Sequence, residues 1–310
     1  MQDKKLCVLF PGQGSQQKGM GRDLADSDKD IMELWKKAEK ITGAPLREIF
    51  WDGDESEMKK TKYQQPALCV VGISLWTKLG PNPDFLAGHS IGEYPALIVS
   101  KVLDLDDGLK LVALRGKLMY EVGLSSPGKM AAILKLKQEE VEKIVSEIKD
   151  NTGKVLCIAN YNSPKQLVIS GDGDAVEMAC EVAKKKKARS VILPVSGAFH
   201  SPLMEEAAKE LASYMDKFKF NNAAIPIFFN ATALSETKGE KIKQIMKKQM
   251  ISPVYFTQLI ENQWDNGVRK WLELGPKGVL CGLIKRILKD KEEKWECKVI
   301  EDLEGVKAYS

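Results

Sequence analysis

The sequence has little of what marks secreted, membrane-spanning or metal-binding proteins. Its 310 residues hold only six cysteines, scattered without a CxxC pair. This spacing favours reduced and mostly buried thiols over a disulfide framework or a zinc site. The apolar run at residues 6–10 is far too short for a membrane span or the core of a signal peptide. With no other targeting pattern visible, we expect a cytoplasmic protein with no membrane partner.

Charge of one sign is also scarce. The formal net charge is +4, and nucleic-acid binding usually needs a concentrated basic patch. The densest basic run, residues 184–187, closes an amphipathic stretch, and we interpret it as a solvated helix end. We therefore expect no nucleic-acid partner. The length allows one large domain or two smaller ones.

Strand-like runs alternate with helical ones along most of the chain, which predicts an α/β fold with a mostly parallel sheet. No repeat and no low-complexity segment interrupts this order. The candidate strands of the larger domain are residues 6–10, 85–89, 225–230 and 270–274.

The middle of the chain has a different rhythm, which begins after a turn-rich stretch at residues 123–128. The predicted elements are a strand (130–134), a helix (138–149), two strands (155–161 and 166–170), a helix (174–187) and a strand (190–195). This βαββαβ order is the ferredoxin-like arrangement. We therefore predict a small ferredoxin-like subdomain at residues 126–195, inserted in a large catalytic domain formed by residues 1–125 and 196–310.

One serine stands in a pattern typical of nucleophiles. Residues 88–92 read Gly-His-Ser-Ile-Gly, which fits G-x-S-x-G, with an apolar strand before it and a helix after it. Such a bend exposes the hydroxyl of Ser90 in an α/β-hydrolase-like domain, and the flanking glycines let neighbouring backbone approach. The helix at 92–100 would aim N–H groups at developing negative charge. The alternative is a tight strand-to-helix turn in which the serine is only a cap.

A serine nucleophile needs a proton acceptor, and the chain has only two histidines. His89 precedes Ser90 on an extended segment, so the two side chains point to opposite sides, and we interpret His89 as a packed residue. His200 follows a predicted strand in a loop, where α/β enzymes gather their catalytic groups. No acidic residue stands out as a third member. We therefore predict a Ser-His dyad, with a backbone carbonyl orienting the imidazole.

An arginine lies on the apolar face of a predicted helix at residues 103–122. At about 100° per residue, Arg115 falls among the leucine, valine and methionine side chains of this helix. A guanidinium there is costly unless it meets acceptors. Two interpretations remain open at this point: a buried ion pair, or a cleft arginine that holds an acidic substrate through a bidentate pair.

Taken together, these motifs resemble the malonyl-CoA:acyl carrier protein transacylases of bacterial fatty-acid synthesis and the related acyltransferases of polyketide synthases. The resemblance covers nearly the whole chain, and the motifs occur in the same order. The matching segments are residues 10–16, 88–93, 115, 160–164, 197–201, 249–254 and 273–276.

The resemblance implies roles for single residues. Ser90 matches the nucleophile and His200 the base. Arg115 matches the arginine that pairs with the free carboxylate of malonate. Gln13 and Ile91 match positions whose backbone N–H groups form the oxyanion hole, with isoleucine in place of the commoner leucine.

Two further positions match the pocket of the family. Gln249 matches a residue whose main-chain carbonyl orients the histidine. Phe199 is similar to the malonyl-selecting version of its motif, where bulk disfavours an α-methyl branch.

The implied reaction is ping-pong transfer of malonyl from malonyl-CoA to the phosphopantetheine thiol of acyl carrier protein, with no cofactor and no metal. We expect a monomer. A discrete polyketide-synthase acyltransferase and a serine esterase or thioesterase remain alternatives.

Overall fold

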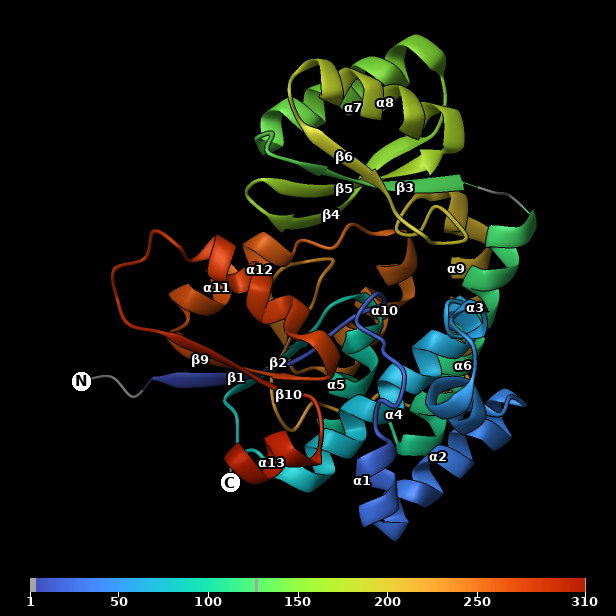
Figure 1. Ribbon diagram of the computed structural model, residues 1–310, viewed down its shortest axis with the longest axis vertical. Coiled ribbons are helices and arrows are strands. Elements are labelled where there is room, and N and C mark those ends of the chain that lie inside the picture. Colours follow the sequence, from blue (N-terminus) through green and yellow to red (C-terminus); the bar gives the residue numbers. More distant parts are fainter. Residues whose placement is uncertain (1–3, 126–127, 310) are drawn as a thin grey trace.

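The computed structural model describes residues 4–125 and 128–309. A six-stranded sheet forms the centre of the larger part of the molecule, which consists of the segments before and after the small sheet at residues 128–192 (Figure 1). The strand order is β10-β9-β1-β2-β7-β8. All neighbouring pairs are parallel except β7 and β8. The strands are β1 (Lys5–Phe10), β2 (Phe85–Gly88), β7 (Ile227–Phe228), β8 (Ser235–Glu236), β9 (Val268–Leu274) and β10 (Glu296–Ile300). The predicted α/β fold with a mostly parallel sheet is confirmed, whereas β8 and β10 were not predicted.

Helices cover both faces of this sheet. Successive side chains of β1 point to opposite faces, and the residues on each face pack into a different apolar cluster. Val8 and Phe10 belong to a core cluster with α2 (Lys29–Thr42), α4 (Thr61–Leu79), α6 (Leu105–Ser125) and α9 (Glu205–Met215). Cys7 and Leu9 belong to a second cluster with α11 (Phe256–Asp265) and α12 (Val279–Ile287). The continuous apolar run of β1 is therefore that of a strand buried on both faces.

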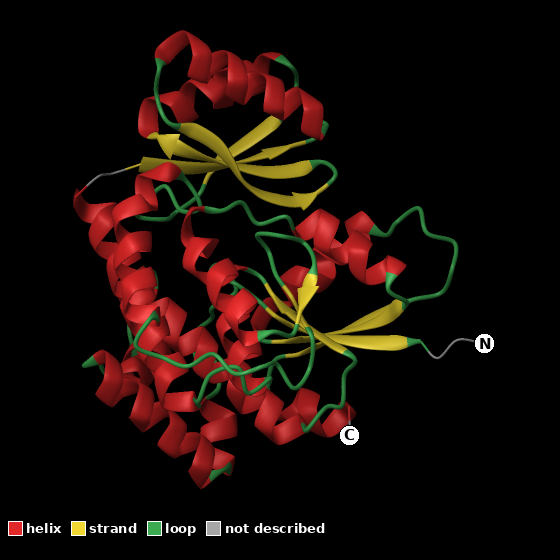
Figure 2. Ribbon diagram, turned by 180° about the vertical axis from the view of Figure 1, so that it is seen from behind, coloured by secondary structure: helices red, strands yellow, loops and turns green. Residues whose placement is uncertain are grey.

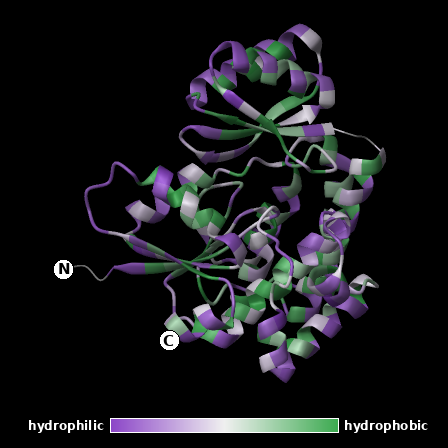
Figure 3. Ribbon diagram, viewed as in Figure 1, coloured by the Kyte–Doolittle hydropathy of each residue, from purple (hydrophilic) through white to green (hydrophobic). Residues whose placement is uncertain are grey.

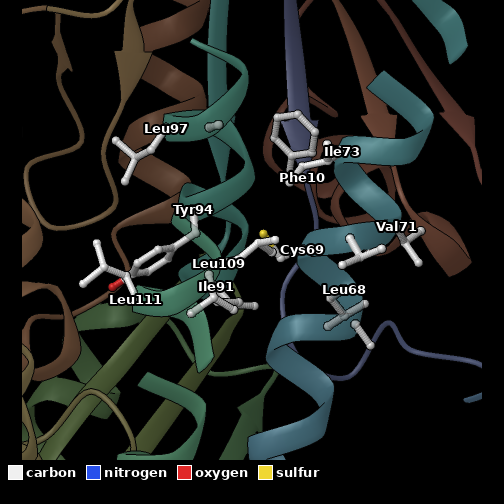
Figure 4. Packing of buried hydrophobic residues seen from close by; sticks show 14 of the residues in the cluster. Phe10, Leu68, Cys69, Val71, Ile73, Ile91, Tyr94, Leu97, Leu109 and Leu111 are labelled. Carbon is white, nitrogen blue, oxygen red and sulfur yellow. The ribbon is translucent and has the colours of Figure 1, made fainter. Parts of the chain in front are cut away.

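The hydropathy of the ribbon follows this arrangement, with apolar residues on the inner strands and hydrophilic ones on the outer helix faces (Figure 3). Figure 4 shows the core around α4, where Cys69 and Leu68 lie opposite Ile91 and Tyr94. The other α-helices of the larger part are α1 (Arg22–Ser27), α3 (Glu55–Met58), α5 (Glu93–Val99), α10 (Gly239–Lys248) and α13 (Leu303–Tyr309). Among the described residues, no helix is long and apolar enough to cross a membrane.

A separate four-stranded sheet follows α6 in the chain and lies beside the first (Figure 2). Its order is β4-β5-β3-β6, and every neighbouring pair is antiparallel. Two helices pack on it through their own apolar cluster. The elements are β3 (Gly128–Leu134), α7 (Gln138–Thr152), β4 (Leu156–Ser163), β5 (Gln166–Asp172), α8 (Gly173–Lys185) and β6 (Arg189–Ile192). This is the predicted ferredoxin-like βαββαβ unit.

Several element ends differ from the prediction. The predicted turn at residues 123–125 is the last turn of α6, and residues 126–127 lie outside the described residues. Gly123 is a glycine that allows close packing and does not mark a turn. An added Cβ would lie 2.5 Å from the backbone oxygen of Ser196. The strand predicted at 225–230 is only Ile227–Phe228, and β6 ends at Ile192.

The expectation of reduced thiols is wrong for two of the six cysteines. Cys281 on α12 and Cys297 on β10 form a disulfide with a Cα–Cα distance of 5.6 Å. Because β10 pairs with β9 and lies against α12, two cysteines without a recognisable spacing become neighbours. The other four cysteines are free, and three of them are buried.

The small sheet contacts the large part through its edge strand β4. The N–H of Tyr161 donates to the carbonyl oxygen of Val254 at 2.8 Å, and the N–H of Val254 donates to that of Ala159 at 2.8 Å. The hydroxyl of Thr257 donates to the carbonyl oxygen of Tyr161 at 2.9 Å. These bonds hold the segment at residues 249–254 beside the small sheet.

Candidate active site

Ser90 occupies a strained bend between β2 and α5. Its φ is +53°, in the left-handed region that residues other than glycine rarely adopt. A 3₁₀ turn, Ser90–Gly92, leads directly into α5. A Cβ on Gly88 would lie 2.0 Å from the backbone carbon of Gly92, and one on Gly92 would lie 2.0 Å from the carbonyl oxygen of Phe10. Both glycines of the motif are therefore required by close backbone approach.

The structure brings the predicted base to the predicted nucleophile across 110 residues of chain. Nε2 of His200 lies 2.8 Å from Oγ of Ser90. Its Nδ1 lies 3.2 Å from the carbonyl oxygen of Gln249 and 2.9 Å from that of Ser252. Carbonyl oxygens only accept, so Nδ1 carries the proton and Nε2 is left to accept one. The nearer carbonyl, that of Ser252, was not predicted.

The imidazole of His200 is held in its neutral form. Burial lowers its pKa to about 3, and the positive charge of Arg115 adds to this effect. The bonds to the carbonyl oxygens of Ser252 and Gln249 act in the opposite direction. A base that is neutral at physiological pH is ready to accept a proton from a hydroxyl.

The low pKa of His200 predicts a specific loss of stability in acid. In the unfolded chain this imidazole takes up a proton below about pH 6.5, so the unfolded state binds more protons between that value and the folded pKa of about 3. Stability linked to neutral His200 is present above about pH 6.5 and is lost as the pH falls. Between about pH 6.5 and pH 5, we expect the wild type to lose about 2 kcal/mol more than His200→Ala. Urea unfolding of both proteins measures this difference, and parallel losses would contradict the assigned pKa.

Arg115 is completely buried and contacts the hydroxyl of Ser90. Its Nη2 donates to Oγ of Ser90 at 3.1 Å, its Nη1 to Oε1 of Gln65 at 2.7 Å, and its Nε to Oε1 of Gln249 at 3.1 Å. Within residues 4–125 and 128–309 it forms no ion pair. A buried guanidinium surrounded by neutral acceptors is costly. The direct ion pair that the sequence left open is therefore not present, and the cation is available to an incoming anion.

A cavity of about 280 Å³ opens over the dyad. Ser90 and His200 line it, as do the predicted residues Gln13 and Phe199. Ile91 lies in the turn after the serine and is buried. The other lining residues are Gly14, Gln16, Lys59, Gln64, His89, Met119, Met130, Asn160, Leu193, Pro194 and Val195. Larger hollows beside α6 contain neither Ser90 nor His200.

Asn230, which the sequence did not predict, holds the bend at Ser90 through two hydrogen bonds of its side chain. Its Oδ1 accepts from the N–H of Ser90 at 2.6 Å, and its Nδ2 donates to the carbonyl oxygen of Gly88 at 2.7 Å. His89 turns to Asn162, whose Oδ1 lies 2.9 Å from its Nε2, in keeping with its interpretation as a packed residue. Asn230 stands in no motif, so only its contacts reveal it.

Metal ligation has no visible basis in the described part of the chain. No group of three or more His, Cys, Asp or Glu side chains there is arranged to hold an ion.

Fold and site together are typical of enzymes that carry an acyl group on a serine. The family model for the acyl transferase domain matches residues 8–305. The chain is 36% identical over 308 residues to malonyl CoA-acyl carrier protein transacylase of Staphylococcus aureus, covering 99% of this chain and 98% of that one. The chain belongs to the malonyl-CoA:acyl carrier protein transacylase family.

Solved structures agree over the full length. The acyl carrier protein S-malonyltransferase of Vibrio cholerae superposes with a TM-score of 0.91 at 38% identity, covering 99% of this chain and 100% of that one. A malonyl-transacylase in complex with a type II polyketide synthase (PKS) acyl carrier protein gives a TM-score of 0.90 at 33% identity, covering 98% of each chain.

Proposed function

We propose that this chain transfers malonyl from malonyl-CoA to the phosphopantetheine thiol of acyl carrier protein, through an ester on Ser90. The choice of a malonyl group rests on the surroundings of Arg115. Its Nη2 lies 3.1 Å from Oγ of Ser90, and its side chain is fully buried without an ion pair among the described residues. A carboxylate on the substrate would supply the missing negative charge.

In the first half-reaction Nε2 of His200 accepts the hydroxyl proton as Oγ of Ser90 attacks the thioester carbonyl. Backbone N–H groups of Gln13 and Ile91 stabilise the resulting oxyanion. The carbon–sulfur bond then breaks, and the CoA sulfur leaves with the proton from His200. The products are CoA and a malonyl ester on Ser90.

In the second half-reaction the thiol of acyl carrier protein attacks the ester carbonyl and gives its proton to His200. The bond to Oγ of Ser90 breaks, and His200 returns the proton to this oxygen. Arg115 holds the malonyl carboxylate through both steps. Phe199, which lines the cavity beside the dyad, limits the space available to an α-methyl branch.

The setting of this reaction is also part of the proposal. We infer a cytoplasmic monomer, with the ferredoxin-like subdomain at residues 126–195 and the catalytic domain at residues 1–125 and 196–310. The separate sheet and the separate apolar cluster of the small unit support this division. The cavity is lined by both parts, because Ser90 and His200 belong to the large part and Met130 and Asn160 to strands of the small sheet.

Incubation with malonyl-CoA alone tests the proposed function. We expect a burst of about one CoA per chain, because the ester persists until a thiol arrives. Adding acyl carrier protein should then restart CoA release and produce malonyl-carrier. Steady release of free malonate without a carrier would instead indicate a hydrolase and would contradict transfer.

A further inference from the structure

Glu93 is a fully buried carboxylate beside the dyad that the proposed reaction does not use. It is the first residue of α5 and is 0% exposed. Its Oε1 accepts from the N–H of Asn230 at 2.5 Å, and its Oε2 accepts from Nε2 of Gln249 at 2.7 Å. A buried carboxylate is costly unless it is satisfied in this way, so its presence here calls for a physical role.

The side chain of Gln249 connects Glu93 to Arg115. Its Nε2 donates to Glu93 and also to the carbonyl oxygen of Ser90 at 2.8 Å. Its Oε1 accepts from Nε of Arg115 at 3.1 Å. Both oxygens of Glu93 accept from N–H donors, so Glu93 reinforces the direction of this amide that the carbonyl oxygen of Ser90 and the donor-only guanidinium also require: the NH₂ group faces the carboxylate and the oxygen faces the guanidinium.

This arrangement keeps the far edge of Arg115 available. Among the described residues, two acidic side chains are coupled to the guanidinium, those of Tyr94 and Glu93. The phenol of Tyr94 is neutral because burial raises its pKa, and Glu93 acts through Gln249 instead of by direct contact. Nη1 and Nη2 are left with the neutral acceptors Gln65 and Ser90. A substrate carboxylate can replace neutral acceptors more readily than it can displace a salt-bridged carboxylate.

We propose that Glu93 is a positioning residue that acts through the side-chain amide of Gln249 on Arg115, and so sets the preference for acyl groups that end in a carboxylate. This inference rests on the proposed function. Its chemistry is hydrogen bonding alone, because Glu93 touches neither the reacting atoms nor the cavity wall.

The decisive measurement is the ratio of malonyl to acetyl transfer onto Ser90, taken as kcat/KM from the two CoA thioesters. Glu93→Gln removes the charge and replaces one of two acceptor oxygens by an NH₂ donor, although both oxygens face N–H donors, those of Asn230 and Gln249. The support of the Gln249 amide is therefore weakened, and we expect this ratio to fall about tenfold or more. A disturbance of the bend at Ser90 would lower kcat/KM for both CoA thioesters, and this effect cancels in the ratio. A merely structural role would therefore lower both rates and leave the ratio unchanged.

Glu273→Gln is the matched control. Glu273 is also 0% exposed and accepts two backbone N–H groups, those of Leu280 and Cys281, at 3.0 and 2.7 Å. Burial raises the pKa of both carboxyls to about 7, so the two substitutions remove comparable groups. Glu273 lies outside the cavity and the Arg115 contacts, and we expect its variant to keep the wild-type ratio.

Gln249→Met provides a second route if Glu93→Gln does not fold. It removes the amide but keeps the main-chain carbonyl that faces His200. We expect the same fall in the ratio, and no further fall when Glu93→Gln is added, because both act through one contact.

An unchanged or increased malonyl-to-acetyl ratio in Glu93→Gln, or in Gln249→Met where the first variant does not fold, would overturn this inference. The proposed function fails separately, if the wild type forms no malonyl ester at all. Wild-type ester with an unchanged variant ratio leaves the function standing and removes only the role of Glu93.

Discussion

Replacing Ser90 with alanine is expected to abolish the malonyl-enzyme and to lower the transfer rate by about 10⁴-fold or more. The reason is that Oγ of Ser90 is the atom on which the acyl group would be carried, with Nε2 of His200 at 2.8 Å to receive its proton. The glycines that shape the bend are unchanged, so the backbone should keep its course. Mass spectrometry of the intact protein after exposure to malonyl-CoA measures the added malonyl group directly.

Ser74→Ala is the control for loss of a serine hydroxyl elsewhere in the large part of the chain. Ser74 is fully buried and donates only to the carbonyl oxygen of Val70 one turn earlier in α4, so its variant should acquire the malonyl group as the wild type does. A malonyl ester that persists in Ser90→Ala, located by peptide mapping elsewhere in the chain, would refute the assignment of the nucleophile.

Replacing Arg115 with alanine is expected to lower kcat/KM for malonyl-CoA by about 10²-fold or more, while acetyl transfer changes much less. A bidentate pair between guanidinium and carboxylate contributes roughly 3 kcal/mol through two charge-assisted hydrogen bonds. An acetyl group has no carboxylate and never makes this pair. The measurement is the rate of Ser90 acylation from each thioester, with thermal unfolding to register the loss of the bonds to Gln65 and Gln249.

Two variants of the same helix sharpen this test. Arg115→Lys keeps the charge without the planar fork, so its malonyl rate should fall between those of alanine and arginine. Lys117→Ala removes a cation whose side chain is 63% exposed on the outer face of α6, and should change neither rate. Equal losses for malonyl and acetyl in Arg115→Ala would show that the arginine serves the fold and not the substrate.

Local sequence was sufficient for features that depend on neighbours in the chain. The alternation of strands and helices predicted both sheets apart from β8 and β10, because periodicity records which face of each element is buried. The G-x-S-x-G pattern predicted the bend at Ser90, since only glycine accepts the backbone contacts at Gly88 and Gly92. With two histidines in the chain, the prediction of His200 as the base followed from elimination and from its position after a predicted strand.

Resemblance to a family supplied what local pattern left open, above all the pairing of Arg115 with a carboxylate. From periodicity alone, a buried ion pair and a substrate-binding arginine are the same residue on the same helix face. The structure gives Arg115 neutral partners that are distant in sequence, Gln65 and Gln249, and its pairing with a substrate carboxylate remains a proposal.

The sequence by itself determined the bend at Ser90 and most of the elements of both sheets, because each of these depends on the pattern within a short segment. Ser90 and His200 were predicted as a pair from motif and elimination, but their approach to 2.8 Å is a result of the tertiary structure. Only the tertiary structure decided the rest: the second carbonyl at Ser252, the hydrogen bonds of Asn230 to the bend, the buried carboxylate of Glu93 and the disulfide between Cys281 and Cys297. Each of these is a contact between segments that meet only after the chain has folded. Spacing along the sequence carries no record of such contacts.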